Sequence, residues 1–334
     1  MIPCSAPLPN HEAWQRHLAE GFRSAKALLA HLGLERLWTP AMEAAARRFP
    51  LRVPRYYADL MTPGDPDDPL LRQVLPDSAE LTSPPGYGTD PTGDSDALAG
   101  PGLLHKYPQR ALVITTGGCA VHCRYCFRRH FDYTAAGARP ARWDPVLDAL
   151  AKTPDLEEVI LSGGDPLLLD DDRLGILLEG LATLPGLRRL RIHSRLPVVL
   201  PQRIGERLVH LIASTGLPAV LVLHVNHPAE LTEFLSCALS SLRRAGIALL
   251  NQAVLLRGVN DSLETQLELN KKLFESGILP YYLHQLDKVR GAAHFQVPDE
   301  HAKALHAAMQ QRLPGYLVPK LVREIPGASC KRPL

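Results

Sequence analysis

Short apolar runs alternate with amphipathic segments from residue 111 to about residue 285, which is the pattern of repeated strand–helix units. The apolar runs predict six strands at Ala111–Thr116, Glu158–Ser162, Leu187–His193, Ala219–Val225, Ala248–Leu255 and Leu279–Gln285. The segments between them predict helices near Asp144–Lys152, Asp170–Leu184, Pro201–Ser214, Pro228–Ala245 and Asp261–Ser276. Repeated βα units favour an α/β fold with a parallel sheet.

The position of the polar residues favours a barrel over a doubly wound sheet, which would fit the alternation equally well. Nearly every polar cluster lies at or just after the end of a predicted strand. The clusters are Cys119–Cys126, Gly163–Asp165, His193–Arg195, His224–His227, Arg257–Gly258 and Asp287–Lys288. Loops that converge on one site from all strands are typical of a (β/α) barrel. The sequence therefore predicts a partial (β/α)6 barrel, open on one side.

The first hundred residues have a different pattern. Apolar residues at three- and four-residue spacing predict a helix, and they are Trp14, Leu18, Phe22, Ala25 and Leu29. A second helix is predicted at Ala41–Arg48, whereas Pro, Gly, Asp and Ser clusters between Met61 and Pro101 predict an irregular connection. We expect a helical cap and connection over 1–100, the barrel over 101–290 and a C-terminal segment over 291–334.

Composition narrows the class of function. A net charge of +2, with 22% charged residues, shows neither the basic excess of a nucleic-acid binder nor an acidic tail. No apolar run approaches the ~18 residues of a membrane span, and the N-terminus has no leader pattern. Three of the six cysteines lie between 119 and 126, which suits metal binding in a reducing compartment. We expect a cytoplasmic protein that acts on a small molecule or a protein.

The strongest chemical signal is the C-x3-C-x2-C motif of Cys119, Cys123 and Cys126, directly after a predicted strand. Three close thiolates can ligate three irons of a [4Fe–4S] cluster and leave the fourth without a protein ligand. That iron can bind S-adenosylmethionine, whose sulfonium is cleaved to a 5′-deoxyadenosyl radical by an electron from the cluster. The alternative is a structural zinc site completed by His122 or His130, although the chain has no second C-x2-C pair.

This motif, placed after the first strand of the βα repeats, resembles the signature of the radical S-adenosylmethionine superfamily. Further segments resemble the lysine 2,3-aminomutase family, and they are Cys126–Arg129, Leu161–Leu167, His224–Pro228 and Asn251–Asn260. The likeness runs from about Phe49 to the C-terminus. Segments Tyr281–Val289 and Gly291–Phe295, with a chain that stops three residues past Lys331, resemble the short bacterial members that form (R)-β-lysine for modification of elongation factor P.

The resemblance implies which residues bind the S-adenosylmethionine. Gly163, Gly164 and Asp165 would bind its amino group, because glycine lets the backbone approach a ligand and a carboxylate can add a charge-assisted contact. The alternative is a plain strand-to-helix turn. The same cofactor would be lined by His224, Asn226 and Gln252, which by themselves read as ordinary polar residues at a barrel mouth.

The resemblance also implies pyridoxal phosphate, because a nitrogen can migrate between neighbouring carbons only while it is held in a π system. Lys331 would be the Schiff-base lysine, although Ala328–Cys330 stands where the family usually has glycines. Lys106 and Arg110 would bind the phosphate. Without the resemblance, these three residues read as surface cations.

Substrate recognition follows from charge. The resemblance implies that Arg128 would bind the α-carboxylate of an amino acid, and that Asp287 and Glu324, at the family's two anionic positions, would bind the ε-ammonium of lysine. The hypothesis is an isomerase that converts (S)-α-lysine to (R)-β-lysine by 2,3-amino migration, reduced by a donor such as flavodoxin and linked to elongation factor P and its ligase. The alternatives are glutamate or arginine as substrate, and a metal-stabilised barrel that binds a translation factor without chemistry. Free or protein-bound lysine and the number of subunits stay open.

Overall fold

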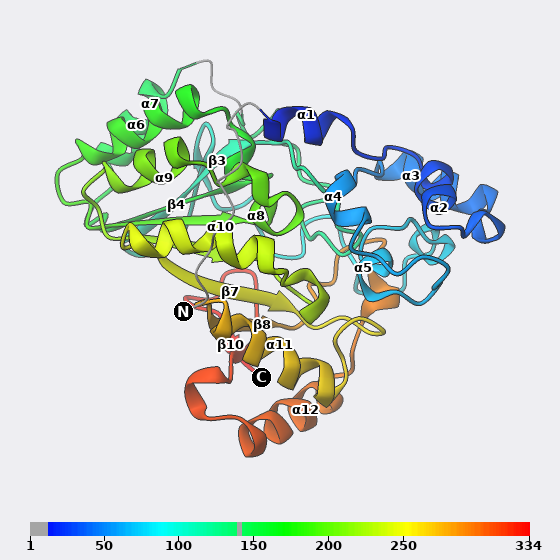
Figure 1. The fold of residues 1–334 in the computed structure, drawn as a ribbon. Coiled ribbons are helices and arrows are strands. Elements are labelled where there is room, and N and C mark those ends of the chain that lie inside the picture. Colours follow the sequence, from blue (N-terminus) through cyan, green and yellow to red (C-terminus); the bar gives the residue numbers. More distant parts are fainter. Residues whose placement is uncertain (1–12, 139–141) are drawn as a thin grey trace.

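A sheet ordered β1 to β10 runs through the computed structural model, which describes residues 13–138 and 142–334 (Figure 1). Its six central strands are β3 (Arg110–Thr116), β4 (Glu158–Gly163), β5 (Arg189–Ser194), β6 (Ala219–Leu223), β7 (Ala248–Val254) and β8 (Leu279–His284). Neighbours from β3 to β8 pair in parallel, which confirms the six predicted strands and the α/β class. Because the order is linear, β1 and β10 are the two edges.

Four further strands at the sheet edges were not predicted. They are β1 (Leu98–Gly100), β2 (Leu103–Tyr107), β9 (Lys320–Arg323) and β10 (Arg332–Pro333). β1 and β2 extend the sheet from β3 in antiparallel pairing, while β9 is parallel to β8 and antiparallel to β10. These edges carry two of the predicted cofactor residues, since Lys106 lies on β2 and Lys331 directly precedes β10.

Helices pack around the outside of the sheet (Figure 1). The predicted ones are α6 (Asp144–Ala151), α7 (Asp171–Ala182), α9 (Glu206–Ala213), α10 (Glu233–Arg244) and α11 (Leu263–Glu275). α9 and α10 begin later than predicted, because Pro201 and Pro228 start separate 3-10 turns. The helices α8 (Leu196–Val199) and α12 (Asp299–Arg312) were not foreseen, nor were the short α4 (Arg55–Ala58) and α5 (Pro69–Arg72) near the N-terminus. None of the described helices has the length and apolar character needed to cross a bilayer.

Along the strands, apolar side chains that face the core alternate with side chains that face a cavity. On β5, Leu190 and Ile192 join the hydrophobic core with the outer helices, whereas Arg191 and His193 face a cavity on the other side. β4 follows the same rule, with Val159 in the core and Ser162 at the cavity. Successive side chains of a strand point to opposite faces, so the inner face of the sheet is free to carry polar chemistry.

The N-terminal cap consists of short helices: α1 (Ala13–Ala19), α2 (Ala25–His31), α3 (Pro40–Arg48), α4 (Arg55–Ala58) and α5 (Pro69–Arg72). The prediction of one helix across Trp14 to Leu29 is wrong in its middle. There Phe22 and Val53 exchange backbone hydrogen bonds of 2.7 and 3.0 Å, and a Cβ on Gly21 would lie 2.7 Å from the Val53 carbonyl oxygen. Tertiary pairing therefore overrides the helical spacing.

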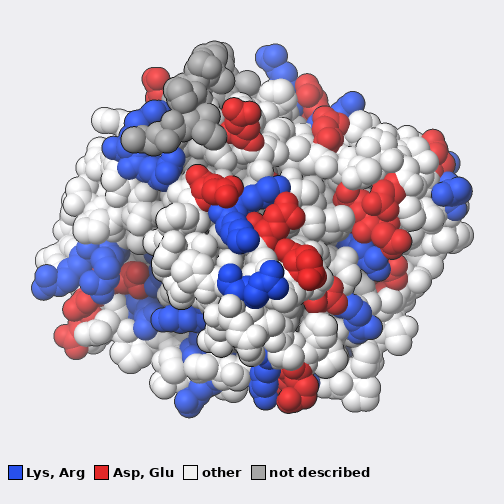
Figure 2. Space-filling view, turned by 60° about the horizontal axis from the view of Figure 1, so that its bottom comes forward, with Lys and Arg blue, Asp and Glu red and all other residues white. Residues whose placement is uncertain are grey.

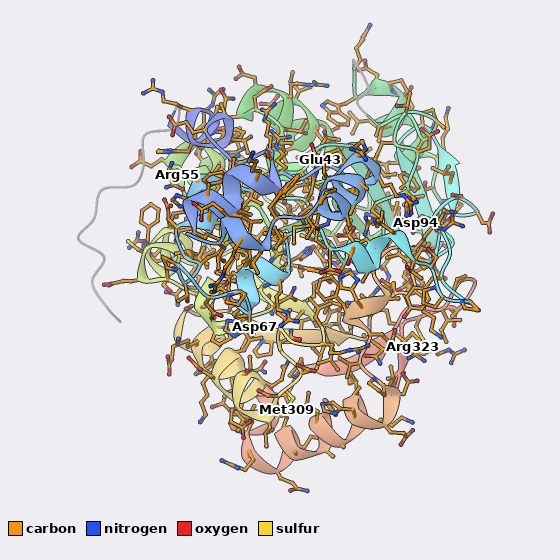
Figure 3. The ribbon with its side chains drawn as sticks, turned by 90° about the vertical axis from the view of Figure 1, so that its right-hand side faces the viewer. Glu43, Arg55, Asp67, Asp94, Met309 and Arg323 are labelled. Carbon is orange, nitrogen blue, oxygen red and sulfur yellow. The ribbon has the colours of Figure 1, made fainter. Side chains whose placement is uncertain are left out.

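The N-terminal helices share a hydrophobic core with the parallel sheet, since Trp14 and Leu29 belong to the same buried cluster as Val159 and Leu190. Figure 3 looks onto this side of the molecule, with Glu43 and Asp67 on the cap and Met309 on α12 below. On the face shown in Figure 2, basic and acidic side chains are interspersed, which fits the small net charge.

Candidate active site

A cavity of about 580 Å³ lies against the inner face of the sheet and is lined from β2 round to the segment before β10. It brings together every predicted site residue: Lys106, Arg110, Cys119, Cys123, Cys126, Arg128, Gly163, Gly164, Asp165, His224, Asn226, Gln252, Asp287, Glu324 and Lys331. Thiols, cations and carboxylates from distant parts of the chain therefore face one space.

The three cysteines lie on the loop after β3, and all three are free thiols that line the cavity. Burial raises the pKa of Cys126 to about 11 and also raises that of Cys119, to which the charge of Asp165 contributes, and the neighbouring cysteines add to both shifts. Such thiols are protonated at neutral pH and would release protons on binding metal. No group of three or more His, Cys, Asp or Glu within 13–138 and 142–334 is arranged around a single metal ion. Each cysteine of a cubane binds a different iron.

Gly164 is required by the packing of the cysteine loop. A Cβ on Gly164 would overlap the carbonyl oxygen of Gly118, and the backbone N–H of Gly164 donates to Thr116 at 2.7 Å. Gly163 has a φ of 116°, a conformation that L side chains rarely adopt. These glycines therefore let the ends of β3 and β4 meet, a reason that the sequence reasoning did not foresee.

Asp165 fastens the end of β4 to the end of β5. Its carboxylate accepts hydrogen bonds from the Ser194 hydroxyl at 2.7 Å and from the backbone N–H groups of Leu167, Arg195 and Leu196 at 2.9 to 3.1 Å. Both oxygens thus already have two donors each. Asp165 therefore holds the ends of two strands together, and its direct contact with an ammonium stays a prediction.

The side chain of Asn226 is likewise hydrogen-bonded to other residues of the protein. Its amide nitrogen donates to Tyr125 at 2.7 Å and to Gln73 at 3.0 Å, while its oxygen accepts from the backbone of Val254 at 2.9 Å. Gln252 and His224 differ, because they bond to each other at 2.8 Å and line the cavity. Burial lowers the pKa of His224 to about 3, so its imidazole is neutral.

Glu80 clamps the cysteine loop and was missed in the sequence. Its carboxylate accepts from Arg124 at 2.5 and 2.8 Å and from Arg129 at 2.6 Å, and the three side chains are buried. Arg129 also donates to the backbone oxygen of Gly291 at 3.1 Å. The loop is thus tied to the cap and to the segment after β8.

Replacing Glu80 by alanine is expected to lower the free energy of unfolding by about 3–5 kcal/mol, because it leaves two buried guanidinium groups without their counter-charge. Denaturant unfolding followed by circular dichroism measures the change. The matched control is Glu43→Ala on the exposed face of α3, which should stay within about 0.5 kcal/mol of the parent. A Glu80→Ala loss no larger than the control's would contradict the clamp.

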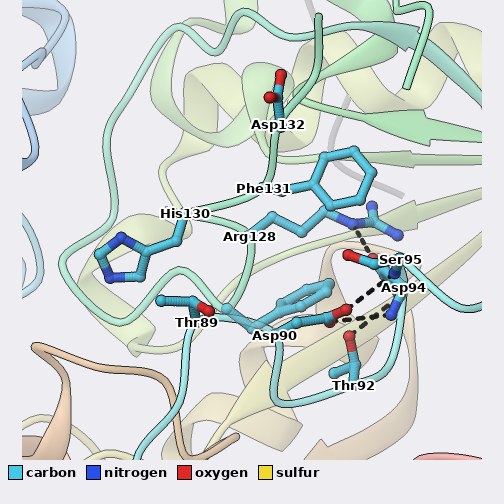
Figure 4. A pocket seen from close by; sticks show the side chains of 10 residues that line it. Thr89, Asp90, Thr92, Asp94, Ser95, Arg128, His130, Phe131 and Asp132 are labelled. Atoms are coloured by element: carbon cyan, nitrogen blue, oxygen red, sulfur yellow. Dashed lines mark hydrogen bonds and ion pairs between the residues drawn. The ribbon is translucent and has the colours of Figure 1, made fainter. Parts of the chain in front are cut away.

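Asp94, also missed, holds two of the predicted cations. It pairs with Arg128 Nε at 2.6 Å and with Lys106, and Figure 4 shows it beside Arg128. Burial alone would raise the pKa of Asp94, but the charges of Arg128 and Lys106 outweigh it and hold this pKa well below its usual range. Arg128 Nη2 has no hydrogen-bond partner among the described residues. Lys106, by contrast, is already neutralised.

Lys331 and Glu324 form an ion pair that lines the same cavity as the thiols. Lys331 Nζ donates to Glu324 at 2.5 Å, and the Tyr107 hydroxyl donates to the other oxygen of Glu324 at 2.5 Å. Burial would raise the pKa of Glu324, but Lys331 outweighs it and lowers this pKa. The two predicted anionic residues therefore differ, because the Asp287 carboxylate has no hydrogen bond or ion pair within the described residues.

Two half-buried histidines were not predicted as site residues. His193 on β5 and His284 on β8 line the cavity, and the Nε2 atom of each is buried without a hydrogen-bond partner. Burial lowers the pKa of both, so neither is charged at neutral pH. Each lies at an inward-facing position of its strand, and this alternation was the signal available in the sequence.

Comparison with known proteins agrees with this geometry. Residues 113–269 match the model of the Radical SAM superfamily. Together with the thiol-lined cavity, this match places the chain in the class of radical S-adenosylmethionine enzymes. The superfamily implies a [4Fe–4S] cluster and S-adenosylmethionine as cofactors.

Relatives give the family. The L-lysine 2,3-aminomutase of Escherichia coli K12 is 48% identical over 98% of this chain and 95% of its own length, and that of Haemophilus influenzae is 44% identical over 99% and 98%. The Clostridium subterminale enzyme of the same name is 34% identical over 96% of this chain and 77% of its own. The chain belongs to the L-lysine 2,3-aminomutase family, whose members are isomerases, and the predicted resemblance is confirmed.

Proposed function

We propose that this protein converts (S)-α-lysine to (R)-β-lysine by 2,3-amino migration. One observation carries the proposal: the cavity that holds the three thiols also holds an amine, Lys331, and a half-buried carboxylate, Asp287, that forms no ion pair within the described residues. The relatives named L-lysine 2,3-aminomutase support lysine as the substrate.

The donor set fits the cluster, because three free thiols on one loop face the cavity. When bound, the cluster supplies the electron that cleaves S-adenosylmethionine. Cys119, Cys123 and Cys126 would hold it. The backbone at Gly163 and Gly164, with His224 and Gln252, would line the S-adenosylmethionine, while Asp165 and Asn226 keep the surrounding loops in place.

Other residues that line the cavity fit pyridoxal phosphate. Lys331 offers an amine, and the unpartnered Nε2 atoms of His193 and His284 offer neutral hydrogen-bonding groups to a polar ring. When bound, this cofactor supplies the π system through which nitrogen can migrate. Arg110 would meet its phosphate. Lys106 would bind the phosphate only while it also pairs with Asp94, which already neutralises its charge.

Charge selects the substrate. Arg128 would bind the α-carboxylate through its free Nη2, and Asp287 would bind the distal ammonium. Glu324 would help only when Lys331 no longer holds it. A glutamate side chain would face Asp287 with like charge, which disfavours that alternative substrate.

We further propose a cytoplasmic role in which β-lysine supplies the modification of elongation factor P, with a flavodoxin-like protein as electron donor. Identity supports a form like the Escherichia coli protein, since the chain is 48% identical to that protein and 34% identical to the clostridial one. A reducing compartment also suits a thiol-ligated cluster.

The test is anaerobic incubation with lysine, S-adenosylmethionine, pyridoxal phosphate and dithionite, followed by chiral chromatography and mass spectrometry. We expect (R)-β-lysine. Glutamate and arginine are offered in parallel, and formation of a β-amino acid from either of them without β-lysine would overturn the substrate assignment. Normal cleavage of S-adenosylmethionine without any β-amino acid product would overturn the assignment of an aminomutase activity.

Lysine binding is expected to tighten as the pH rises from 6 to 7 and to level off above 7.5. Burial raises the pKa of Asp287 to about 7, the charge of Lys331 offsetting it only in part, so below pH 7 the carboxyl is mostly neutral. Binding a cation favours the charged form and releases one proton, which changes the Kd by up to about tenfold per pH unit below the pKa.

Calorimetric titration of lysine without S-adenosylmethionine measures this dependence. Asp287→Asn should bind lysine weakly with a flat pH profile, whereas the exposed Asp96→Asn should behave like the parent. A parent profile that is flat or falls with pH would remove Asp287 from the ammonium site.

A further inference from the structure

A buried polar network centred on Arg195 lies beside the cysteine loop, and the proposed aminomutase reaction gives its guanidinium no role. Arg195 follows β5 and is 5% exposed. Its guanidinium donates to five side chains, which are Cys123 Sγ at 2.6 Å, Gln73 and Glu230 at 2.7 Å, Tyr57 at 3.2 Å, and Tyr125. One of these acceptors is therefore a predicted cluster ligand.

The guanidinium is held from several directions. Glu230, fully buried, accepts from Arg195 and from the Tyr57 hydroxyl at 2.9 Å, and its second oxygen accepts the backbone N–H groups of Asn226 and His227 at 2.6 and 2.9 Å. The Arg195 backbone N–H is bound by Asp165 at 2.9 Å. With both ends fixed, Arg195 presents a permanent positive charge to one sulfur.

We propose that Arg195 is a positioning residue that raises the reduction potential of the cluster through its charged hydrogen bond to Cys123. The inference rests on the cluster named in the proposed function. Adding one electron makes the cluster more negative, and a cation fixed in a buried site stabilises the reduced form more than the oxidised form. Glu230 has the opposite charge and binds Nη2 of Arg195, whereas the sulfur binds Nη1, so Glu230 lowers the same potential.

The experiment is an anaerobic dithionite titration of the reconstituted protein, followed by electron paramagnetic resonance and normalised to iron and sulfide content. Dithionite supplies the single electron per cluster. Arg195→Gln should lower the ratio of reduced to oxidised cluster at a fixed potential at least about tenfold, which corresponds to about 59 mV for one electron. Glu230→Gln should raise that ratio.

A matched control separates this role from general damage. Arg203 is also buried, pairs with Asp171 at 2.7 Å and donates to the Leu167 carbonyl oxygen, but it has no hydrogen bond to a cysteine of the loop. Arg203→Gln should leave the potential of the cluster unchanged. An equal shift in this variant would overturn the proposal.

The remaining outcomes are also decisive. Full clusters with an unshifted potential in Arg195→Gln would overturn the inference. Where Arg195→Gln assembles no cluster, Glu230→Gln decides, because an unchanged or lowered potential there would equally overturn it. A parent protein without a cubane spectrum would overturn the proposed function itself, whereas a normal spectrum with unshifted variants overturns only the role of Arg195.

Discussion

Replacing Cys126 by serine is expected to abolish the iron–sulfur cluster and every activity that needs it. One iron would lose its thiolate, and a serine hydroxyl is a poor replacement for a soft sulfur ligand. Iron and labile sulfide should fall to a small fraction of the parent's content after anaerobic reconstitution. Reductive cleavage of S-adenosylmethionine should fall by about 10⁶-fold or more, the lower end of ordinary enzymatic rate enhancements, because no other source of the electron remains.

The control is Cys330→Ser, which changes an exposed thiol at the edge of the same cavity. It should retain the parent's iron and sulfide content. Full cluster content in Cys126→Ser would remove the triplet as the ligand set. One zinc per chain, with no iron in the reconstituted parent, would favour the structural zinc site instead.

The cavity could be predicted because its residues follow strands. A parallel sheet places the carboxyl ends of its strands at one edge, so the loops after β3, β4, β6 and β8 had to meet. That rule brought Cys119, Gly163, His224 and Asp287 to one space without any knowledge of the packing. The same rule cannot say whether a side chain faces the cavity or the protein, and Asp165 and Asn226 turned out to be held by neighbouring segments.

Other residues carried no readable signal. Asp94 and Glu80 lie in a stretch rich in Pro, Gly, Asp and Ser, where a carboxylate reads as a solvated loop residue. Their roles depend on Arg128 and Arg124, which lie more than thirty residues away in sequence. Ion pairs over that separation follow from the tertiary fold alone. Strand β10, with two residues, is likewise too short for any periodicity to show.

Replacing Lys331 by alanine is expected to abolish retention of pyridoxal phosphate and the formation of β-lysine. Nζ of Lys331 lies at the cavity and within 2.5 Å of Glu324, so its removal takes away the only amine proposed to bond to the cofactor. β-Lysine formation should fall at least about 10³-fold, equivalent to roughly 4 kcal/mol of transition-state stabilisation. Absorbance of bound pyridoxal phosphate after desalting gives the second measurement, and cluster content should be unchanged.

Lys331→Arg separates covalent binding from simple charge pairing. Arginine keeps a cation beside Glu324 and Tyr107 but offers no amine that bonds to pyridoxal phosphate, so it should be as inactive as the alanine variant. Lys320→Ala, on the exposed side of β9, is the control for loss of a nearby lysine and should retain activity. An active Lys331→Arg would mean that this position serves Glu324 electrostatically. The cofactor lysine would then have to be sought elsewhere along the cavity wall, where Lys106 is the other lysine that lines it within the described chain.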